Sequence, residues 1–297
     1  MDKWRIWLLL IICNLFWAGN YVFGKYVIAE MTPLWITFSR WSLALLLLLP
    51  IARYMEKTAG STVKKDWLLL LGMGVLGVIG YNLVLYSALE YTTATNAALV
   101  SALNPGVIVM FSVVLLRERV SSLQTLGFIA SLSGALIVLT HGDFTRVLQA
   151  QFNLGDLLML AAVLIWTLYS LIGRKLSTPP ITATAVSAGI AVLLMAPFAA
   201  AQGIDTGKIG PLAVTGIFYM VIFPSVGSFV FWNISVRAVG ASKVGVFLNL
   251  IPVFTAIISG LLGETITGAQ VLGGLLVFCG VYLTTGMLER GLGPGKL

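Results

Sequence analysis

Charged side chains are scarce in this chain. They make up 10% of its 297 residues, whereas hydrophobic residues make up 59%. A soluble domain carries roughly 25% charged residues, so this composition excludes a soluble globular protein. Little polar sequence remains between the apolar stretches to form a separate soluble domain. The composition therefore predicts an integral membrane protein.

The chain also has few of the side chains that catalyse reactions or bind metals. Its single histidine, His141, falls in a predicted loop, and Cys13 and Cys279 fall inside apolar stretches. We interpret both cysteines as small packing residues rather than a disulfide or a metal pair. A nucleophile would find no histidine at membrane depth, and a metal site would need a cluster of ligands. We expect no enzyme, no metal site and no cofactor.

Long apolar segments recur along the whole chain. A helix of about 20 apolar residues is long enough to cross the hydrocarbon core of a membrane. We expect the first segment to be a mature helix rather than a cleaved signal peptide, because no clear small-x-small cleavage site follows a short apolar core. The predicted fold is an all-α integral membrane protein with ten transmembrane helices. They cover about residues 6–28, 33–53, 67–89, 93–116, 121–140, 153–174, 180–201, 210–236, 241–262 and 266–288.

The second half of the chain repeats the first about 147 residues later. These matches predict two five-helix repeats, residues 1–145 and residues 150–290. The matched pairs are Trp17 with Trp166, Pro105 with Pro252, Glu118 with Glu264, Gly127 with Gly273, and Gly134 with Gly280.

The positions of the basic residues predict the topology. With a cytoplasmic N-terminus, fourteen of the eighteen basic residues lie on the cytoplasmic side, and Lys25, Arg40, Arg146 and Lys208 are the other four. This is the positive-inside distribution, so the net charge of +7 reflects topology and does not indicate nucleic-acid binding. Because five is an odd number, the second repeat is inverted. Inverted membrane repeats build a central site that opens alternately to either side, which indicates transport.

Two tryptophans fall near the middle of predicted helices. Tryptophan normally gathers at the membrane interfaces, whereas Trp17 and Trp166 occupy matched positions at depth. They either pack helices together or form two halves of an aromatic-lined cavity, and we adopt the cavity interpretation. Residues of the same two helices that join them by helical spacing are Asn14, Tyr21, Tyr169 and Ser170.

Other polar and amphipathic residues also fall at membrane depth. An amide buried in lipid without a partner costs several kcal/mol, so these side chains should face the interior of the bundle. They bind either a substrate or other helices. The candidates are Tyr81, Asn82 and Tyr86 in the third helix, Ser101 and Asn104 in the fourth, and Ser228 and Trp232 in the eighth.

Arg40 is the clear cation within a predicted span. A buried arginine needs a partner or water, and the sequence leaves three alternatives. Arg40 pairs with Glu30 or Glu90, extends outward to the interface, or holds the carboxylate of a substrate. No Asp, Glu or His lies at the centre of a predicted span. Transport would therefore not be coupled through a midplane carboxylate, which leaves facilitated diffusion or exchange.

Pro105 and Pro252 occupy matched positions in the fourth and ninth predicted helices. A proline in the middle of a helix removes a backbone hydrogen bond and kinks the helix. We predict that both prolines are hinges for gating, and a static kink is the alternative.

Several of these motifs resemble those of the drug/metabolite transporter superfamily, and in particular its EamA-type branch of amino-acid and metabolite exporters. The resemblance covers nearly the whole chain. The motifs that carry it are Phe16-Trp17-Ala18-Gly19-Asn20, Pro33 followed by Arg40, Asn104-Pro105 before Leu116-Arg117-Glu118-Arg119, the stretch from Gly127 to Gly134, and Gly263-Glu264 through Gly280.

The resemblance implies an exporter of small metabolites in the bacterial inner membrane, with a cavity between the two repeats. The aromatic candidates would suit an aromatic or apolar amino acid through stacking. The alternatives are export of other small solutes, such as drugs or nucleobases, or a membrane scaffold or sensor that transports nothing. The expected partners are a small-molecule substrate and the lipid bilayer, without nucleic acid. A monomer is compatible with the sequence.

Overall fold

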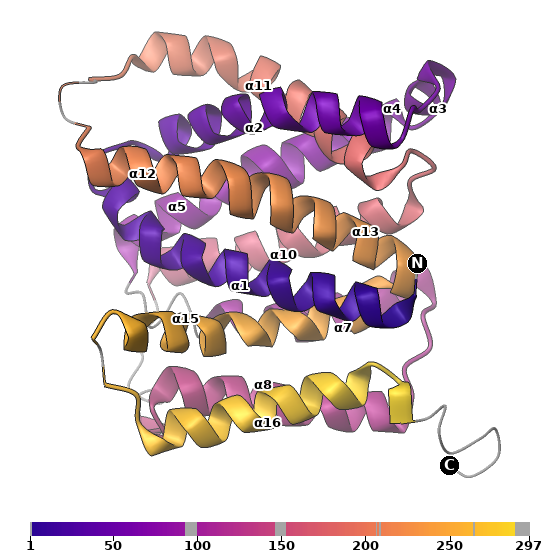
Figure 1. Ribbon diagram of the computed structural model, residues 1–297, viewed down its shortest axis with the longest axis vertical. Coiled ribbons are helices and arrows are strands. Elements are labelled where there is room, and N and C mark those ends of the chain that lie inside the picture. The colour runs from indigo at the N-terminus through magenta and orange to yellow at the C-terminus, as the bar shows by residue number, and fades with distance from the viewer. Residues whose placement is uncertain are drawn as a thin grey trace.

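A computed structural model of the protein describes residues 2–92, 100–145, 153–205, 207, 209–263 and 265–288, and only the backbone of Lys25. Helices are the only regular secondary structure in these ranges (Figure 1), as the sequence predicted. Several predicted features lie outside the described residues. They are the start of the fourth helix at 93–99, the repeat match Glu264, the outer basic residues Arg146 and Lys208, and the limits 150 and 290 of the second repeat.

Within the part of the chain that the structure describes, eight helices are long and apolar enough to cross a membrane. Two shorter apolar helices, α7 with 13 residues and α16 with 17, occupy the places of the predicted fourth and tenth spans. The first half contains α1 (Lys3–Ile28), α2 (Pro33–Met55), α3 (Gly60–Lys65), α4 (Trp67–Met73), η1 (Gly74–Gly80), α5 (Tyr81–Tyr91), α7 (Asn104–Leu116) and α8 (Ser122–Thr140). The second half contains α10 (Leu154–Lys175), α11 (Pro180–Gln202), α12 (Pro211–Met220), η3 (Val221–Ser228), α13 (Phe229–Val239), α14 (Ala241–Gly245), η4 (Val246–Asn249), α15 (Leu250–Leu261) and α16 (Gly268–Thr284).

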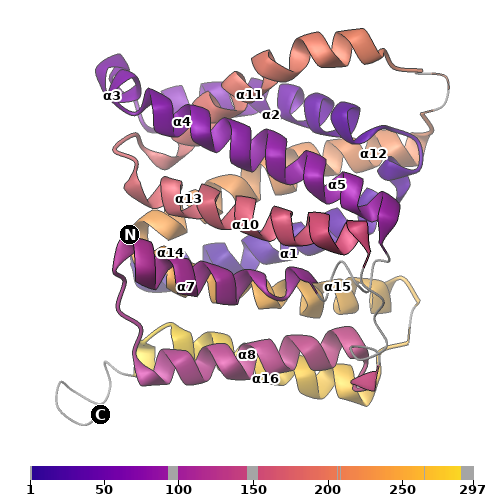
Figure 2. The same ribbon diagram turned by 180° about the vertical axis from the view of Figure 1, so that it is seen from behind.

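The long helices lie side by side, and α1 begins on the same side of the bundle on which α16 ends (Figure 1). The pair α2 and α11 forms one end of the stack and the pair α8 and α16 forms the other (Figure 2). Large apolar side chains are exposed on the outside of the bundle, among them Leu46, Leu193 and Leu261. Exposed leucines are costly in water and favourable against lipid.

Four glycines form the contact between α8 and α16. A Cβ added at Gly127 would lie 2.6 Å from the carbonyl oxygen of Gly280, and one at Gly134 would lie 2.5 Å from that of Gly273. Any larger side chain would therefore separate the two backbones. Small residues of this kind let membrane helices approach closely. These are the glycines that the sequence comparison matched between the two halves.

The first turns of the same two helices are also alike. Ser121 accepts a hydrogen bond from the backbone of Gln124 at the start of α8, and the Gln124 side chain accepts one from Ser121 N. Thr267 and Gln270 form the same reciprocal pair at the start of α16. Such a capping box satisfies two backbone donors that the first turn of a helix leaves free.

The sequence placed Pro105 and Pro252 in the middle of helices, whereas each lies near the start of an α-helical segment; their role as hinges stays a prediction. Pro105 lies in the first turn of α7, and Pro252 lies in the first turn of α15, directly after the 3-10 stretch η4. The first N–H groups of an α-helix have no intrahelical acceptor, so a proline there costs little. Both prolines therefore mark breaks in the α-helical geometry rather than kinks within it.

Candidate substrate cavity and cytoplasmic closure

A cavity of about 710 Å³ lies in the half of the bundle that the topology predicts to be outer. Its inner end is lined by Trp17, Trp166 and Phe229. Its other end reaches Tyr26 and Ile266, which are exposed at the outer ends of their segments. The cavity therefore extends from the middle of the bundle to the predicted outer surface.

The two tryptophans predicted from the repeat contact each other at the floor of this cavity. The ring centroids of Trp17 and Trp166 lie 5.2 Å apart in a T-shaped arrangement. Tyr81 approaches the Trp166 ring to 4.8 Å, and Phe229 approaches it to 5.4 Å. The contacts of Trp166 with Trp17 and Phe229 are edge-to-face, and the contact with Tyr81 is tilted; aromatic pairs contribute about 0.5–1.5 kcal/mol each beyond the burial of area. The floor is therefore a rigid aromatic surface.

Arg40 lies beside this surface and is 2% exposed. Its Nε donates to Ser225 Oγ at 2.8 Å, and its Nη1 donates to Asn82 Oδ1 at 3.3 Å and to Tyr86 Oη at 2.8 Å. All three acceptors are neutral. Among the described residues Arg40 forms no ion pair, so the predicted pairing with Glu30 or Glu90 is wrong.

The two carboxylates have other surroundings. Glu30 accepts a hydrogen bond from Gly210 N at 2.6 Å, and Glu90 is exposed at the end of α5.

Most of the predicted polar and aromatic candidates line the cavity, but five do not. The lining includes Trp17, Tyr21, Tyr81, Asn82, Tyr86, Ser101, Asn104 and Trp166. It also includes polar residues that were not among the candidates: Asn20, Asn249, Thr255, Ser259 and Gln270. Asn20 carried a signal in the sequence, because it follows Trp17 by three residues and so shares its helix face.

The five remaining candidates pack behind the cavity floor. Ser228 Oγ donates to Cys13 O at 2.9 Å, and Trp232 Nε1 donates to Ser170 Oγ at 3.1 Å. Asn14 Nδ2 donates within its own helix to Leu10 O at 2.6 Å. Tyr169 Oη accepts a hydrogen bond at 2.7 Å from Nδ2 of Asn233, on the neighbouring helix α13. Apart from Asn14, whose hydrogen bond lies within α1, these side chains join different helices and so support the aromatic floor from behind.

The π-helical stretches η1 and η3 were not anticipated from the sequence, although both lie next to the cavity. Segments η1 and η3 each interrupt a long helix between two α-helical parts. The side chain of Asn82 donates to Gly77 O at 3.2 Å and to Val78 O at 2.8 Å, so it satisfies carbonyl groups of η1. π-Helical turns frequently occur at functional sites, and here they adjoin the residues that bind Arg40.

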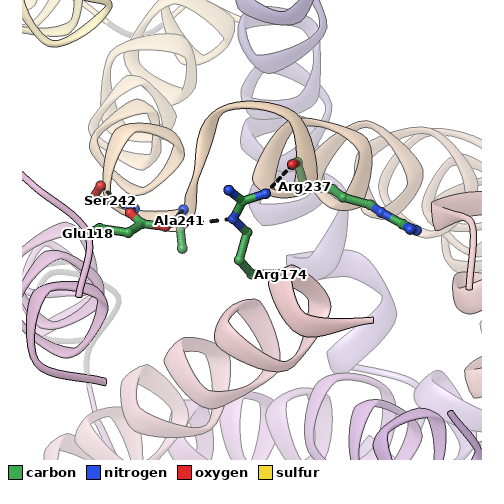
Figure 3. A network of polar contacts seen from close by, with 5 residues as sticks. All are labelled: Glu118, Arg174, Arg237, Ala241 and Ser242. Carbon is green, nitrogen blue, oxygen red and sulfur yellow. Dashed lines mark hydrogen bonds and ion pairs between the residues drawn. The ribbon is translucent and has the colours of Figure 1, made fainter. Parts of the chain in front are cut away.

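The opposite end of the bundle, which the sequence predicts to be cytoplasmic, is closed by polar contacts between the two halves of the chain. Glu118, which follows α7, accepts hydrogen bonds from Ala241 N at 3.1 Å and Ser242 N at 3.0 Å, and one from Ser242 Oγ. Its Oε1 lies 3.9 Å from Arg174 Nε. Arg174 in turn donates to the carbonyl oxygen of Arg237, so the network joins α7, α10, α13 and α14 (Figure 3).

Two more carboxylates of the first half repeat this arrangement at the start of α11. Asp66 accepts from Ser177 N at 2.8 Å, Thr178 N at 2.6 Å and Thr178 Oγ1 at 2.8 Å. Glu56 accepts from Ile181 N at 3.0 Å, and from Thr182 N and Oγ1 at 2.7 and 2.8 Å. Each carboxylate therefore binds two consecutive backbone N–H groups and a hydroxyl.

The environment of Asp66 holds it in the ionised form. Burial raises the pKa of this carboxyl, but the hydrogen bonds from Thr178 and Ser177 and the charge of Lys65 lower it further than burial raises it. The net pKa lies below the ordinary value for an aspartate. Hydrogen bonds to the charged form of a carboxylate have this effect.

Comparison with known proteins finds a transporter family and named transporters among the relatives of this chain. The EamA-like transporter family matches residues 4–140 and again residues 153–286. The uncharacterized transporter YyaM of Bacillus subtilis is 29% identical over 97% of this chain and 96% of its own length. The uncharacterized inner membrane transporter YicL of Salmonella typhimurium is 26% identical over 92% and 93% of the two chains.

Two further similarities extend the comparison. The aromatic amino acid exporter YddG of Ancylobacter novellus is 25% identical over 73% of this chain and 76% of its own. A crystal structure with 21% sequence identity has a TM-score of 0.75 and covers 96% of this chain and 99% of that one. This likeness shows a shared fold.

Apolar helices around an aromatic and polar cavity, closed at one end, define a multi-pass membrane transporter. The chain belongs to the EamA-like transporter family, whose two matches together cover nearly all of it. It is a protein of the bacterial inner membrane, as the sequence predicted, and its relatives are transporters rather than enzymes.

Proposed function

We propose that this protein exports small metabolites, namely amino acids with a preference for aromatic or apolar ones, by alternating access between two inverted five-helix repeats. The single observation that carries the proposal is the cavity floor. There Trp17 and Trp166, matched residues of the two halves, meet between the predicted repeats. A substrate on this floor would contact both repeats, so movement of one repeat against the other would change the side from which the substrate is reached.

Three observations support the repeats, residues 1–145 and 150–290. The same family matches each half of the chain separately. The matched glycines of α8 and α16 form the contact between these two helices, Gly127 against Gly280 and Gly134 against Gly273, and both helices start with the same capping box. Inversion is supported by the distribution of basic residues between the two faces.

The polar closure supports alternating access. The cavity extends to the predicted outer ends of α1 and α15, whereas Glu118, Asp66 and Glu56 join the two halves at the predicted cytoplasmic end. We interpret this arrangement as the outward-facing state. Access from the cytoplasm then requires that hydrogen bonds of these three carboxylates break together.

The chemistry of the lining supports an aromatic or apolar amino acid. Indole and phenol rings at the cavity floor offer stacking and edge contacts to a flat apolar side chain. A relative of this chain is named an aromatic amino acid exporter. The described lining contains no Asp, Glu or His, which supports exchange or facilitated diffusion rather than coupling to a midplane carboxylate.

Counterflow in proteoliposomes tests the proposal. Vesicles loaded with unlabelled L-phenylalanine should accumulate labelled phenylalanine, and Trp166→Ala should abolish this accumulation while Trp4→Ala, at an exposed position, should not. Small polar solutes that exchange while aromatic amino acids do not would refute the substrate. A purified protein that exchanges no solute would indicate a scaffold or sensor. Uphill uptake driven by a pH gradient and abolished by one Asp or Glu substitution would refute the coupling.

A further inference from the structure

We propose that Arg40 is the carboxylate-binding residue of the cavity, and that the site takes the zwitterionic head group of an amino acid. This inference rests on the proposed transport of amino acids. It adds the residue that recognises the charged end, and it is argued from hydrogen-bonding groups that the described protein leaves unpaired.

The guanidinium of Arg40 has donors that no described residue uses. Five N–H groups are available on an arginine, and those of Nε and Nη1 bind Ser225, Asn82 and Tyr86. No described residue accepts from Nη2. The ring of Trp41 lies 5.8 Å from the guanidinium carbon, so one face of the group is covered. The fixed fork of an arginine then presents its edge, which suits bidentate binding of a carboxylate.

The charge of Arg40 is also uncompensated among the described residues. The side chain is 2% exposed and lies in the span formed by α2, but its three acceptors are neutral. A buried cation without a counter-charge is strongly unfavourable in a membrane protein. The described lining of the cavity contains no carboxylate that could supply the missing charge. An anionic group of a ligand in the cavity would supply it.

Two side-chain amides of the cavity lining have a carbonyl oxygen to which no hydrogen-bond donor is bound. The Oδ1 atoms of Asn20 and Asn104 are buried without a hydrogen-bond partner, and both residues line the cavity. A buried carbonyl oxygen is satisfied only by a donor. An ammonium group has three donors and no acceptor, so it matches these amides as a carboxylate matches Arg40. The cavity thus lacks an anion and a donor, which an amino-acid head group provides together.

The contacts of Arg40 would also fit a structural arginine, so the test must distinguish the two roles. Ser225, Asn82 and Tyr86 come from η3 and α5, so Arg40 also joins three helical segments. If Arg40 had only a structural role, its loss would weaken the binding of every ligand to the same extent. A carboxylate-binding arginine would affect only those ligands that carry a carboxylate. The test therefore compares ligands as well as variants.

The experiment measures the binding of four probes to purified protein in detergent: L-phenylalanine, its methyl ester, 3-phenylpropionate and phenethylamine. We expect the wild type to bind phenylalanine most tightly. We expect Arg40→Gln to weaken phenylalanine and 3-phenylpropionate about 10- to 100-fold, the range of a charge-assisted hydrogen bond, and to leave phenethylamine unchanged. Arg53→Gln is the matched control, because Arg53 lies on the same helix and is exposed.

Each outcome decides the proposal. Equal affinity of the wild type for phenylalanine and its methyl ester would overturn it without any variant, so the test survives if Arg40→Gln does not fold. A folded Arg40→Gln protein that keeps the wild-type preference would also overturn it. Binding of L-alanine with a preference for the free carboxylate, but not of phenylalanine, would support Arg40 and refute only the aromatic substrate.

Discussion

At the predicted cytoplasmic end of the bundle, Glu118, Asp66 and Glu56 each accept two backbone hydrogen bonds and one hydroxyl hydrogen bond from the other half of the chain. At the outer end, the polar groups around the cavity include atoms without partners, such as the Oδ1 atoms of Asn20 and Asn104. The carboxylate contacts are complete and join the two halves. The unpaired amide oxygens of the cavity lining would accept hydrogen bonds from a donor that the described residues do not supply.

The difference indicates that one set of polar groups stabilises the fold and that the other set is available to a ligand. Charged hydrogen bonds that are complete stabilise the contact that contains them, by about 1.5–3 kcal/mol each. Buried polar atoms that are incomplete cost about 1–3 kcal/mol each, and a ligand recovers this cost when it binds. Apolar substitutions of the polar groups at the two ends should therefore change stability in different directions.

The largest expected effect concerns the aromatic floor on which the outer cavity rests. Trp166→Ala should lower the free energy of unfolding by about 3–5 kcal/mol, because a buried indole ring is lost and a void is left. Thermal unfolding in detergent measures this loss. Trp4→Ala should change stability by less than about 0.5 kcal/mol, since Trp4 is exposed. Equal effects of the two substitutions would show that the floor is not a packed unit.

At the cytoplasmic end, Glu118→Ala should lower the free energy of unfolding by about 1.5–3 kcal/mol. The substitution removes the acceptor of Ala241 N, Ser242 N and Ser242 Oγ, and leaves Arg174 without its ion pair, and hydrogen bonds to charged groups have this magnitude. Glu118→Gln keeps an acceptor and should lose less. An unchanged melting temperature for Glu118→Ala would contradict the closure.

At the outer end, Asn104→Leu should raise the free energy of unfolding by up to about 1 kcal/mol or leave it unchanged. The reason is that an orphaned amide oxygen is replaced by an apolar group of similar size. The same substitution should reduce phenylalanine counterflow. A protein that is less stable and still fully active would show that Asn104 has a structural role only.

The smallest expected effect is the pH dependence of the closure through Asp66. A carboxyl whose pKa is lowered on folding contributes stability that is present above its unfolded pKa and is lost as the pH falls through the folded pKa. Because the pKa of Asp66 lies below its ordinary value, the stability difference between wild type and Asp66→Asn should be constant from pH 7 to pH 5. It should shrink only below about pH 4. A difference that disappears between pH 7 and pH 5 would contradict the hydrogen-bonded carboxylate.

Much of this fold could be predicted from the sequence, because long apolar segments and the positions of basic residues depend on the membrane itself. The contact between Trp17 and Trp166 followed from their matched positions in the two halves. The sequence could not distinguish residues that line the cavity, such as Thr255, from residues that pack between helices, such as Ser170. Helices that face lipid on one side and protein on the other are apolar on both, so periodicity does not reveal which face points inward.

The sequence did not predict the polar contacts that close the predicted cytoplasmic end, for a related reason. Glu118 stood out in the sequence only as a repeat match. Its partners are backbone N–H groups of Ala241 and Ser242, which no side-chain pattern reveals. The neutral partners of Arg40 were missed similarly, because a cation at depth predicts a carboxylate until the packing of α2 against α5 and η3 is known.

Accessibility of a single cysteine at position 20 tests most directly whether the two ends open in alternation. Asn20→Cys, in a background with Cys13→Ala and Cys279→Ser, should react with membrane-impermeant maleimide added from the outer side. With Glu118→Ala added, reaction from the outer side should fall and reaction from the cytoplasmic side should rise. Reaction from the outer side that is unaffected by Glu118→Ala, with none from the cytoplasmic side, would contradict alternation between the two ends.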